Sequence, residues 1–264
     1  MPITCIERVI VAVVDLEDAC ERWSKAGFAI ASKRMQGFRF DVAQLHAGAI
    51  GIDLYEVKDH HRQLGIWKSA LERGGGIVGG TWGIDSAASE ANPNVSIAHL
   101  DDDFLRFDDL DEFLPGVITA GVPTHTDLVT RRANLDSVCG ANQNTVDYLE
   151  HIVVMTPSLE EAIAAHEKIG LPCKRIREAG GGVRQAFFKL EQTVLEIVGP
   201  GRGTPQVWGL AFMCKDIRRA VNLARANGLE ATEPKTAIQG GKIARIVNPL
   251  DGVAIAYMEP SASS

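Results

Sequence analysis

A gapless internal repeat constrains the fold of this chain more than any other sequence feature. Residues 6–28 align with residues 149–171 at an offset of 143, and the same offset pairs 52–54 with 195–197. Each copy begins with an apolar run typical of a buried strand, continues into a helix with an acidic first turn, and ends at a glycine. Strand-like segments follow in the second half, at 181–190, 193–198, 242–248 and 253–259. The repeat predicts a chain of βαβββ units rather than two unrelated domains.

Further echoes indicate four such units in two halves. A Trp-Gly pair at 82–83 recurs at 208–209, now at an offset of 126, so the first half holds 17 more residues between these landmarks. The surplus coincides with residues 59–75, which contain the helix-like sequence IWKSALERG. A shorter echo within the second half supplies the fourth unit. We predict an N-terminal half at 1–142, with a degenerate second unit, and a C-terminal half at 143–264.

Capping signals mark both ends of the expected helices. Asp15 and Asp216 stand where an N-cap residue is preferred, and Ser158 with Glu161 has the spacing of a capping box. A glycine that adopts a left-handed conformation commonly closes a helix. The expected closing glycines are Gly27, Gly170 and Gly228.

Composition excludes several classes of protein. Of the 264 residues, 45% are apolar and 23% are charged, which is typical of a globular chain and not of a disordered one. The longest apolar runs fall far short of the roughly 20 residues that span a bilayer. A formal charge of −7 indicates no attraction to nucleic acid or to an anionic membrane surface. We therefore expect a small-molecule ligand, with neither nucleic acid nor membrane as a partner.

The cysteines and the N-terminal sequence bear on the compartment. The five cysteines are odd in number, widely spaced and without a C-x-x-C pair, so neither a disulfide framework nor a structural zinc site is predicted. Four lie in apolar surroundings and are expected to be buried thiols, namely Cys5, Cys20, Cys173 and Cys214. The first residues lack a basic segment followed by an apolar one, so no signal peptide is predicted and the cytoplasm is the expected location.

The ordered set of segments resembles the vicinal oxygen chelate superfamily, the group of glyoxalase I, the bleomycin-resistance proteins and the extradiol dioxygenases. Residues 149–162 look like the opening of a glyoxalase-type module, and 193–200 look like its fourth strand. Residues 208–217 and 248–260 look like the first strand and last hairpin of the next module. The resemblance implies an α+β fold in which repeated βαβββ modules form cupped, barrel-like mixed sheets in two similar halves.

The resemblance also implies a divalent metal, held by a first-strand His or Glu and a fourth-strand Glu from each of two modules. His151 and Glu196 occupy these places in the third module, whereas Gly209 and Ala256 occupy them in the fourth. Glu259 lies three residues further along the strand, which places it on the other face of the sheet.

In the N-terminal half, Arg8 and Asp53 stand at the positions of His151 and Glu196, and Gly83 is the second module's first-strand residue. Because Arg presents a fork that fits a carboxylate, we predict an ion pair between Arg8 and Asp53 in place of metal ligands.

Two ligands rarely hold a transition metal, since catalytic zinc sites use three protein ligands. A metal at His151 and Glu196 (Zn, Ni, Mn, Co or Fe) would need further ligands from another chain or from the remaining candidates, which are His60, His61, His99 and His125. Alternatively, His151 and Glu196 form a hydrogen-bonded pair without metal, and His151 acts as an acid or a base.

Four further residues are candidates for substrate binding. Trp82 and Trp208 provide either core packing or an aromatic wall for a ligand. Arg184 and Arg245 lie on strand-like segments, where each either grips a carboxylate or phosphate or is ordinary surface charge.

Three functions follow from these residues. The leading hypothesis is a glyoxalase-like enzyme acting on a small oxo or hydroxy compound by isomerase, epimerase or lyase chemistry centred on His151 and Glu196. The alternative is a metal-free protein that binds or sequesters a small molecule, as the bleomycin-resistance members do. The third is an extradiol-type dioxygenase, which needs a second His where this chain has Gly209. A homodimer is expected, and modules three and four pair either within the chain or across that dimer.

Overall fold

The computed structural model describes residues 3–34, 40–58, 65–84, 97–101, 104–107, 118–123, 128–168, 170–238 and 240–261. Within these residues the chain forms two eight-stranded mixed sheets. The N-terminal sheet contains β1 (Ile3–Val13), β2 (Ser32–Arg34), β3 (Phe40–Ala47), β4 (Ile50–Val57), β5 (Gly76–Ile84), β6 (Ile97–Asp101), β7 (Phe104–Phe107) and β8 (Ile118–Pro123). The C-terminal sheet contains β9 (Val146–Met155), β10 (Arg175–Gly180), β11 (Val183–Leu190), β12 (Thr193–Gly199), β13 (Gln206–Cys214), β14 (Lys235–Thr236), β15 (Lys242–Arg245) and β16 (Ala254–Glu259).

The two sheets have the same topology. Their strand orders are β2-β3-β4-β1-β5-β8-β7-β6 and β10-β11-β12-β9-β13-β16-β15-β14, which coincide when each strand is matched to the strand eight places later. In both, two parallel pairs flank an antiparallel central pair, β1 with β5 and β9 with β13. The parallel registers Arg8↔Gly51 and His151↔Val194 differ by the offset of the sequence repeat. The predicted α+β architecture of repeated βαβββ units is thereby confirmed.

Helices follow the first strands of three units, and their caps agree with the sequence signals. The helices are α1 (Leu16–Lys25), α2 (Gly65–Glu72), α5 (Leu128–Cys139), α6 (Leu159–Lys168) and α7 (Ile217–Ala226). Asp15 and Asp216 cap α1 and α7 by accepting from backbone N–H groups, and Ser158 accepts from Glu161 N. Gly27, Gly170 and Gly228 all have positive φ, as expected of closing glycines.

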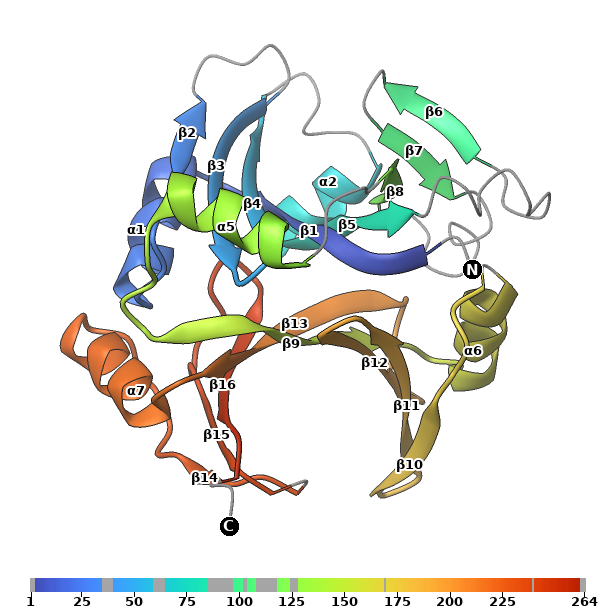
Figure 1. The fold of residues 1–264 in the computed structure, drawn as a ribbon. Helices are drawn as coiled ribbons and strands as arrows, with labels where there is room; N and C mark the ends of the chain where they lie inside the picture. Colours follow the sequence, from blue (N-terminus) through green and yellow to red (C-terminus); the bar gives the residue numbers. More distant parts are fainter. Residues whose placement is uncertain are drawn as a thin grey trace.

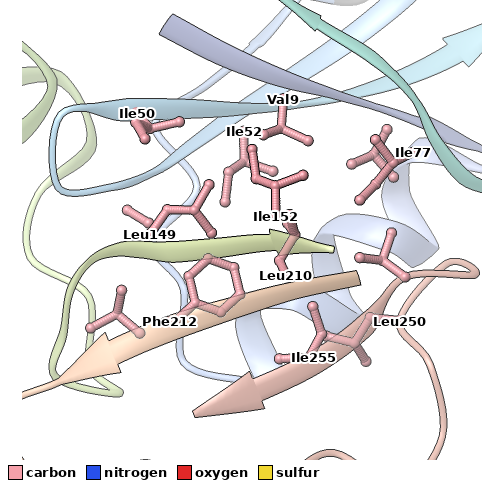
Figure 2. Close-up of a cluster of buried hydrophobic side chains, with 14 of the residues drawn as sticks. Val9, Ile50, Ile52, Ile77, Leu149, Ile152, Leu210, Phe212, Leu250 and Ile255 are labelled. Atoms are coloured by element: carbon pink, nitrogen blue, oxygen red, sulfur yellow. The ribbon is translucent and has the colours of Figure 1, made fainter. Parts of the chain in front are cut away.

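The two sheets curl in opposite directions and pack back to back (Figure 1). Figure 2 shows the buried side chains between them. Those labelled from the N-terminal sheet include Val9, Ile52 and Ile77, and those from the C-terminal sheet include Ile152 and Leu210. Helices α6 and α7 flank the outside of the C-terminal sheet, so its concave face points away from both the helices and the other half.

The concave face of the N-terminal sheet is filled by the chain itself. Helix α2, which the sequence surplus predicted, lies within the curve of this sheet (Figure 1). Ala70 of α2 is fully buried against Ile10, Ala12 and Val78 of the sheet, and Trp67 packs beside them. Because this helix buries its apolar face here, it covers that part of the concave surface.

Polar contacts connect the two halves at two places. Arg131 of α5 is buried, and its guanidinium reaches Glu7 of β1 at 3.0 Å and Glu191 of the β11–β12 turn at 2.5 Å. In the second contact, the buried carboxylate of Asp251, between β15 and β16, accepts hydrogen bonds from Trp23 Nε1 (3.0 Å) and Arg22 Nη2 (2.5 Å) of α1.

Several local expectations are settled by the structure. The segment that links the two halves contains the 12-residue helix α5. Cys5, Cys20 and Cys214 are buried free thiols as predicted, whereas Cys173 is only half-buried. No helix among the described residues is long and apolar enough to cross a membrane.

Candidate functional site

The concave face of the C-terminal sheet carries the candidate site. Along β12 the side chains alternate between buried and half-exposed, and Glu196 belongs to the half-exposed set. The buried set packs toward α6, where Phe188 contacts the ring of His166 at 5.2 Å between centroids. Because side chains alternate along a strand, Glu196 lies on the opposite, concave face. His151 pairs with Val194 in the next strand and so shares that face.

The structure brings His151 and Glu196 together as the sequence analysis predicted. Their nearest atoms, His151 Nε2 and Glu196 Oε2, are 3.9 Å apart, which is longer than a hydrogen bond. The other ring nitrogen, Nδ1, contacts the carboxylate of Glu150. Neither Nδ1 nor the carboxylate oxygen of Glu150 beside it makes a hydrogen bond with the described residues, and Nε2 is the ring nitrogen that faces Glu196.

Burial shifts both groups toward their neutral forms. Desolvation, with smaller contributions from the positive charges of Lys189 and Arg177, lowers the pKa of His151 to about 4. Desolvation also raises the pKa of Glu196, against the opposing effects of Arg177 and of a hydrogen bond from Gln185. At neutral pH the pair therefore combines an uncharged imidazole with a carboxylate of increased basicity, which is a combination suited to proton transfer.

A short hydrogen-bond chain orients Glu196. Arg177 Nε of β10 donates to Gln185 Oε1 of β11 over 2.9 Å, and Gln185 Nε2 donates to Glu196 Oε1. The Arg177 guanidinium also lies over the ring of Phe187, 5.6 Å from its centroid. With Oε1 engaged by Gln185, Glu196 presents Oε2 to His151 and to any ligand.

The described donors on this face are too few to hold a divalent metal by themselves. The register Gly209↔Ala254 of β13 and β16 repeats His151↔Val194 of β9 and β12, so Gly209 and Ala256 hold the places of His151 and Glu196 in the fourth module. Neither residue has a donor side chain. Among the residues that the structure describes, no three His, Cys, Asp or Glu side chains gather closely enough to hold an ion. Metal ligation by His151 and Glu196 stays a prediction that needs further ligands.

The other candidate histidines are not among the described side chains of this face. His60, His61 and His125 lie outside the described residues, and His99 is described only as part of strand β6 at the far edge of the N-terminal sheet. Glu259 is turned to the outer face, as its strand position predicted, where it accepts from Ile217 N at 3.0 Å and caps α7.

The predicted ion pair of the N-terminal half is present. Arg8 Nη1 donates to both carboxylate oxygens of Asp53, at 3.1 and 2.8 Å. Asp53 is 3% exposed, whereas Arg8 is 40% exposed, so the arginine remains hydrated while neutralising a buried carboxylate. Burial raises the pKa of Asp53, and the neighbouring Arg8 and Gln44 oppose that shift.

The alignment of the second module needs a correction. In the central pair of the C-terminal sheet, Gly209 lies opposite Val153, and Ala211 lies opposite His151. In the N-terminal sheet, the equivalents of Val153 and His151 are Ile10 and Arg8, which lie opposite Gly79 and Thr81. The equivalent of Gly209 is therefore Gly79, and not Gly83. The register of β5 with β8 then matches Ala120 to Ala256. In both halves, therefore, the second of the two modules has a Gly at the first-strand ligand position and an Ala at the fourth-strand ligand position.

The two candidate tryptophans differ in burial and in position. Trp82 is 6% exposed and borders a cavity of about 40 Å³ between the sheets, together with Ile152 and Leu195 from the core face. It therefore lies on the opposite side of the C-terminal sheet from the site. Trp208 is 50% exposed on β13, at the register shift beside Gly209.

The two candidate arginines also differ in position. Arg184 points to the outer face, where it pairs with Glu160 of α6, so the structure does not bring it to His151. Arg245 lies opposite Ala256, which holds the place of Glu196, and so belongs to the concave face. Its side chain is exposed and forms no ion pair with the described residues.

Sequence reasoning missed four residues around the pair. Gln185, Phe187 and Lys189 alternate along β11 on the face of Glu196, and Arg177 joins them from β10. Their spacing of two residues along a predicted strand is the signal that places them together, once the register of β11 with β12 is known.

The chain has no match among family models or curated proteins by sequence. Among solved structures it is similar over its whole length to a mutant of 4-hydroxymandelate synthase from Streptomyces coelicolor, with a TM-score of 0.71, 14% identity and 94% of that chain covered. It is also similar over its whole length to a xylose isomerase-like TIM barrel/4-hydroxyphenylpyruvate dioxygenase fusion protein, with a TM-score of 0.68 and 12% identity, and spans 51% of that chain. At these identities the likeness establishes the fold, and it confirms the predicted arrangement of two halves.

Proposed function

Because the chain has the fold of the vicinal oxygen chelate superfamily, we propose that it is an enzyme that moves a proton at a carbon atom of a small oxo or hydroxy compound. The observation that carries this proposal is the pair of His151 and Glu196 on an open concave face, with nearest atoms 3.9 Å apart. Burial lowers the pKa of His151 and raises that of Glu196, which makes the Glu196 carboxylate a stronger base. Many isomerase, epimerase and lyase reactions begin with such a transfer.

Glu196 is the base in the proposed reaction. Its carboxylate takes a proton from the carbon next to a carbonyl group, and the electron pair of that C–H bond moves onto the carbonyl oxygen to give an enolate. The positive charges of Arg177 and Lys189 stabilise the enolate oxygen. His151 Nε2 accepts a hydrogen bond from a substrate hydroxyl and so orients the carbon toward Glu196. The protonated Glu196 then returns the proton to the same carbon, which restores the carbonyl group. Where the β carbon bears a leaving group, the enolate instead re-forms its carbonyl by expelling that group, the bond to it breaks, and Glu196 gives the proton to the departing group.

Exchange of substrate hydrogen with solvent deuterium tests this proposal directly. The protein is incubated in D₂O with a panel of 2-oxo and 2-hydroxy acids, aldehydes and ketones, and C–H exchange is followed by NMR. We expect exchange in at least one compound, and a loss of 100-fold or more in Glu196→Gln, which keeps the size of the side chain. Asp53→Asn changes the equivalent residue of the N-terminal half and should exchange normally. Equal exchange in wild type and Glu196→Gln would refute the assignment.

A binding or sequestering protein is the second candidate. The absence of donor side chains at Gly209 and Ala256 favours it, because neither position supplies a ligand atom for a metal. A compound that raises the melting temperature, and whose carbon-bound hydrogens do not exchange, would support this candidate and contradict the enzyme.

A further inference from the structure

We propose that the ligand of the concave face is a small organic anion with an apolar body, held through its acid group by Arg177 and Lys189 without a divalent cation. This inference rests on the proposed function only in placing the ligand over His151 and Glu196. What it adds is the charge of the ligand and the residues that recognise it.

The first observation is a surplus of positive charge on this face. The chain as a whole carries a formal charge of −7. By strand register, however, five basic residues of the C-terminal sheet belong to the concave face, namely Arg175, Arg177, Lys189, Lys235 and Arg245. Among the described strand residues, the acids beside them are Glu196 and, at a register shift, Glu150. An acidic protein that concentrates cations on one face creates a local field that attracts anions.

The second observation is that the two basic residues nearest the pair are not neutralised. The guanidinium of Arg177 donates to the neutral amide of Gln185 and forms no ion pair with the described residues. The ammonium group of Lys189 donates to the carbonyl of Gln192 at 2.9 Å. Desolvation lowers the pKa of Lys189, and no nearby carboxylate opposes that shift.

The third observation is that both charges act on the proposed proton-transfer pair. Lys189 and Arg177 contribute to the lowered pKa of His151, and Arg177 acts on Glu196 as well. The same positive field that disfavours a proton on His151 disfavours a divalent cation at that place. An acid group bound there would neutralise the field and satisfy the free donors.

Apolar side chains surround these charges and indicate the rest of the ligand. Phe187 lies between Arg177 and the ring of His151, whose centroid is 6.4 Å away, and is half-exposed. Val153 and Val194 are half-exposed on the same face. Half-exposed apolar groups beside unpaired cations suit a carboxylate that carries an aryl or alkyl body.

Two probes of matched shape separate charge from apolar contact. The protein is titrated with 3-phenylpropionate and with 3-phenylpropionamide by isothermal titration calorimetry, at low and at high salt. We expect the acid to bind at least 10-fold more tightly than the amide, and this preference to shrink as salt screens the cations. Addition of MnCl₂ or ZnCl₂ should not strengthen binding of the acid.

Single substitutions assign the preference to residues. Arg177→Gln should remove at least 10-fold of the affinity for the acid while leaving the amide unchanged. Lys189→Gln, at an exposed residue where the substitution is tolerated, should act in the same direction. Arg218→Gln deletes the same charge from an exposed position of α7 and should change nothing. Equal binding of acid and amide, equal effects of Arg177→Gln and Arg218→Gln, or acid binding that requires the added metal would overturn the inference.

The result is separable from the test of the proposed function. Arg177-dependent binding of the acid without C–H exchange in any compound would uphold the anion site and refute the enzyme. Glu196-dependent exchange in a neutral compound, with no preference for acids, would uphold the enzyme and refute the anion site.

Discussion

Replacement of Asp251 should loosen the contact between the two halves by a calculable amount. The backbone of Asp251 has a φ of +46°. Its side chain is 1% exposed and accepts hydrogen bonds from Trp23 Nε1 and Arg22 Nη2. In Asp251→Ala the indole N–H of Trp23, a residue with 0% exposure, loses its partner, at a cost of about 1–3 kcal/mol. Arg22 is 38% exposed, so water replaces the carboxylate and the loss is at most about 1 kcal/mol. Alanine in the left-handed region adds about 1–2 kcal/mol.

The three contributions sum to a loss of about 2–6 kcal/mol in the free energy of unfolding, and two further variants separate them. Asp251→Gly removes the backbone strain and should be about 1 kcal/mol less destabilising than Asp251→Ala. Asp251→Asn tolerates the same φ and keeps one acceptor, so it should be the mildest of the three. Urea unfolding followed by far-UV circular dichroism gives the three values. A loss below 1 kcal/mol for Asp251→Ala would refute the account of this contact, and equal values for Ala and Gly would refute the strain.

Three further predictions concern stability. Gly48→Ala should cost more than Gly74→Ala, because both have positive φ but a Cβ at Gly48 would lie 2.7 Å from a backbone oxygen of β9, whereas Gly74 has open space around it; urea midpoints of the two variants decide this. Trp67→Ala should lower the free energy of unfolding by about 2 kcal/mol, since the Trp67 ring packs against Phe40 with centroids 5.3 Å apart. It should also speed amide hydrogen exchange in α2 and leave exchange in the C-terminal sheet unchanged, and uniform acceleration in both halves would contradict this. Burial lowers the pKa of His166 to about 4, so the unfolded chain binds more protons between pH 6.5 and 4 and stability falls as the pH falls through that window. His166→Gln should make that dependence shallower by up to about 1.4 kcal/mol per pH unit, and unchanged slopes in unfolding measured from pH 6.5 to 4 would refute it.

The sequence predicted those features that depend on periodicity. The gapless repeat aligns a strand, a helix and a closing glycine between the two halves. It therefore predicted that His151 lies near Glu196 and that Arg8 lies near Asp53. The offset fixes which residues are equivalent, and alternation along a strand fixes which of them share a face. Both pairs were therefore accessible without coordinates.

Features that depend on strand register or on rotamers were not accessible in this way. The Trp-Gly echo misaligned the second module by four residues, because a dipeptide in a glycine-rich strand carries less information than the pairing of β5 with β1. The sequence predicted that α2 is helical, but it did not predict that α2 packs within the N-terminal sheet. An apolar helix face indicates that the helix is buried, and it does not indicate which surface buries it. The link from Arg177 through Gln185 to Glu196 depends on side-chain conformations in three strands.

The filling of the N-terminal sheet by α2 bears on how this chain can evolve. Restoring a histidine and a glutamate at Arg8 and Asp53 would still leave the concave face occupied by Ala70 and Trp67. Removing the helix alone would expose an ion pair and no donor set. Neither change alone therefore gives this sheet a second site of the kind seen around His151 and Glu196. Each chain is accordingly expected to bind one ligand, despite its two similar halves.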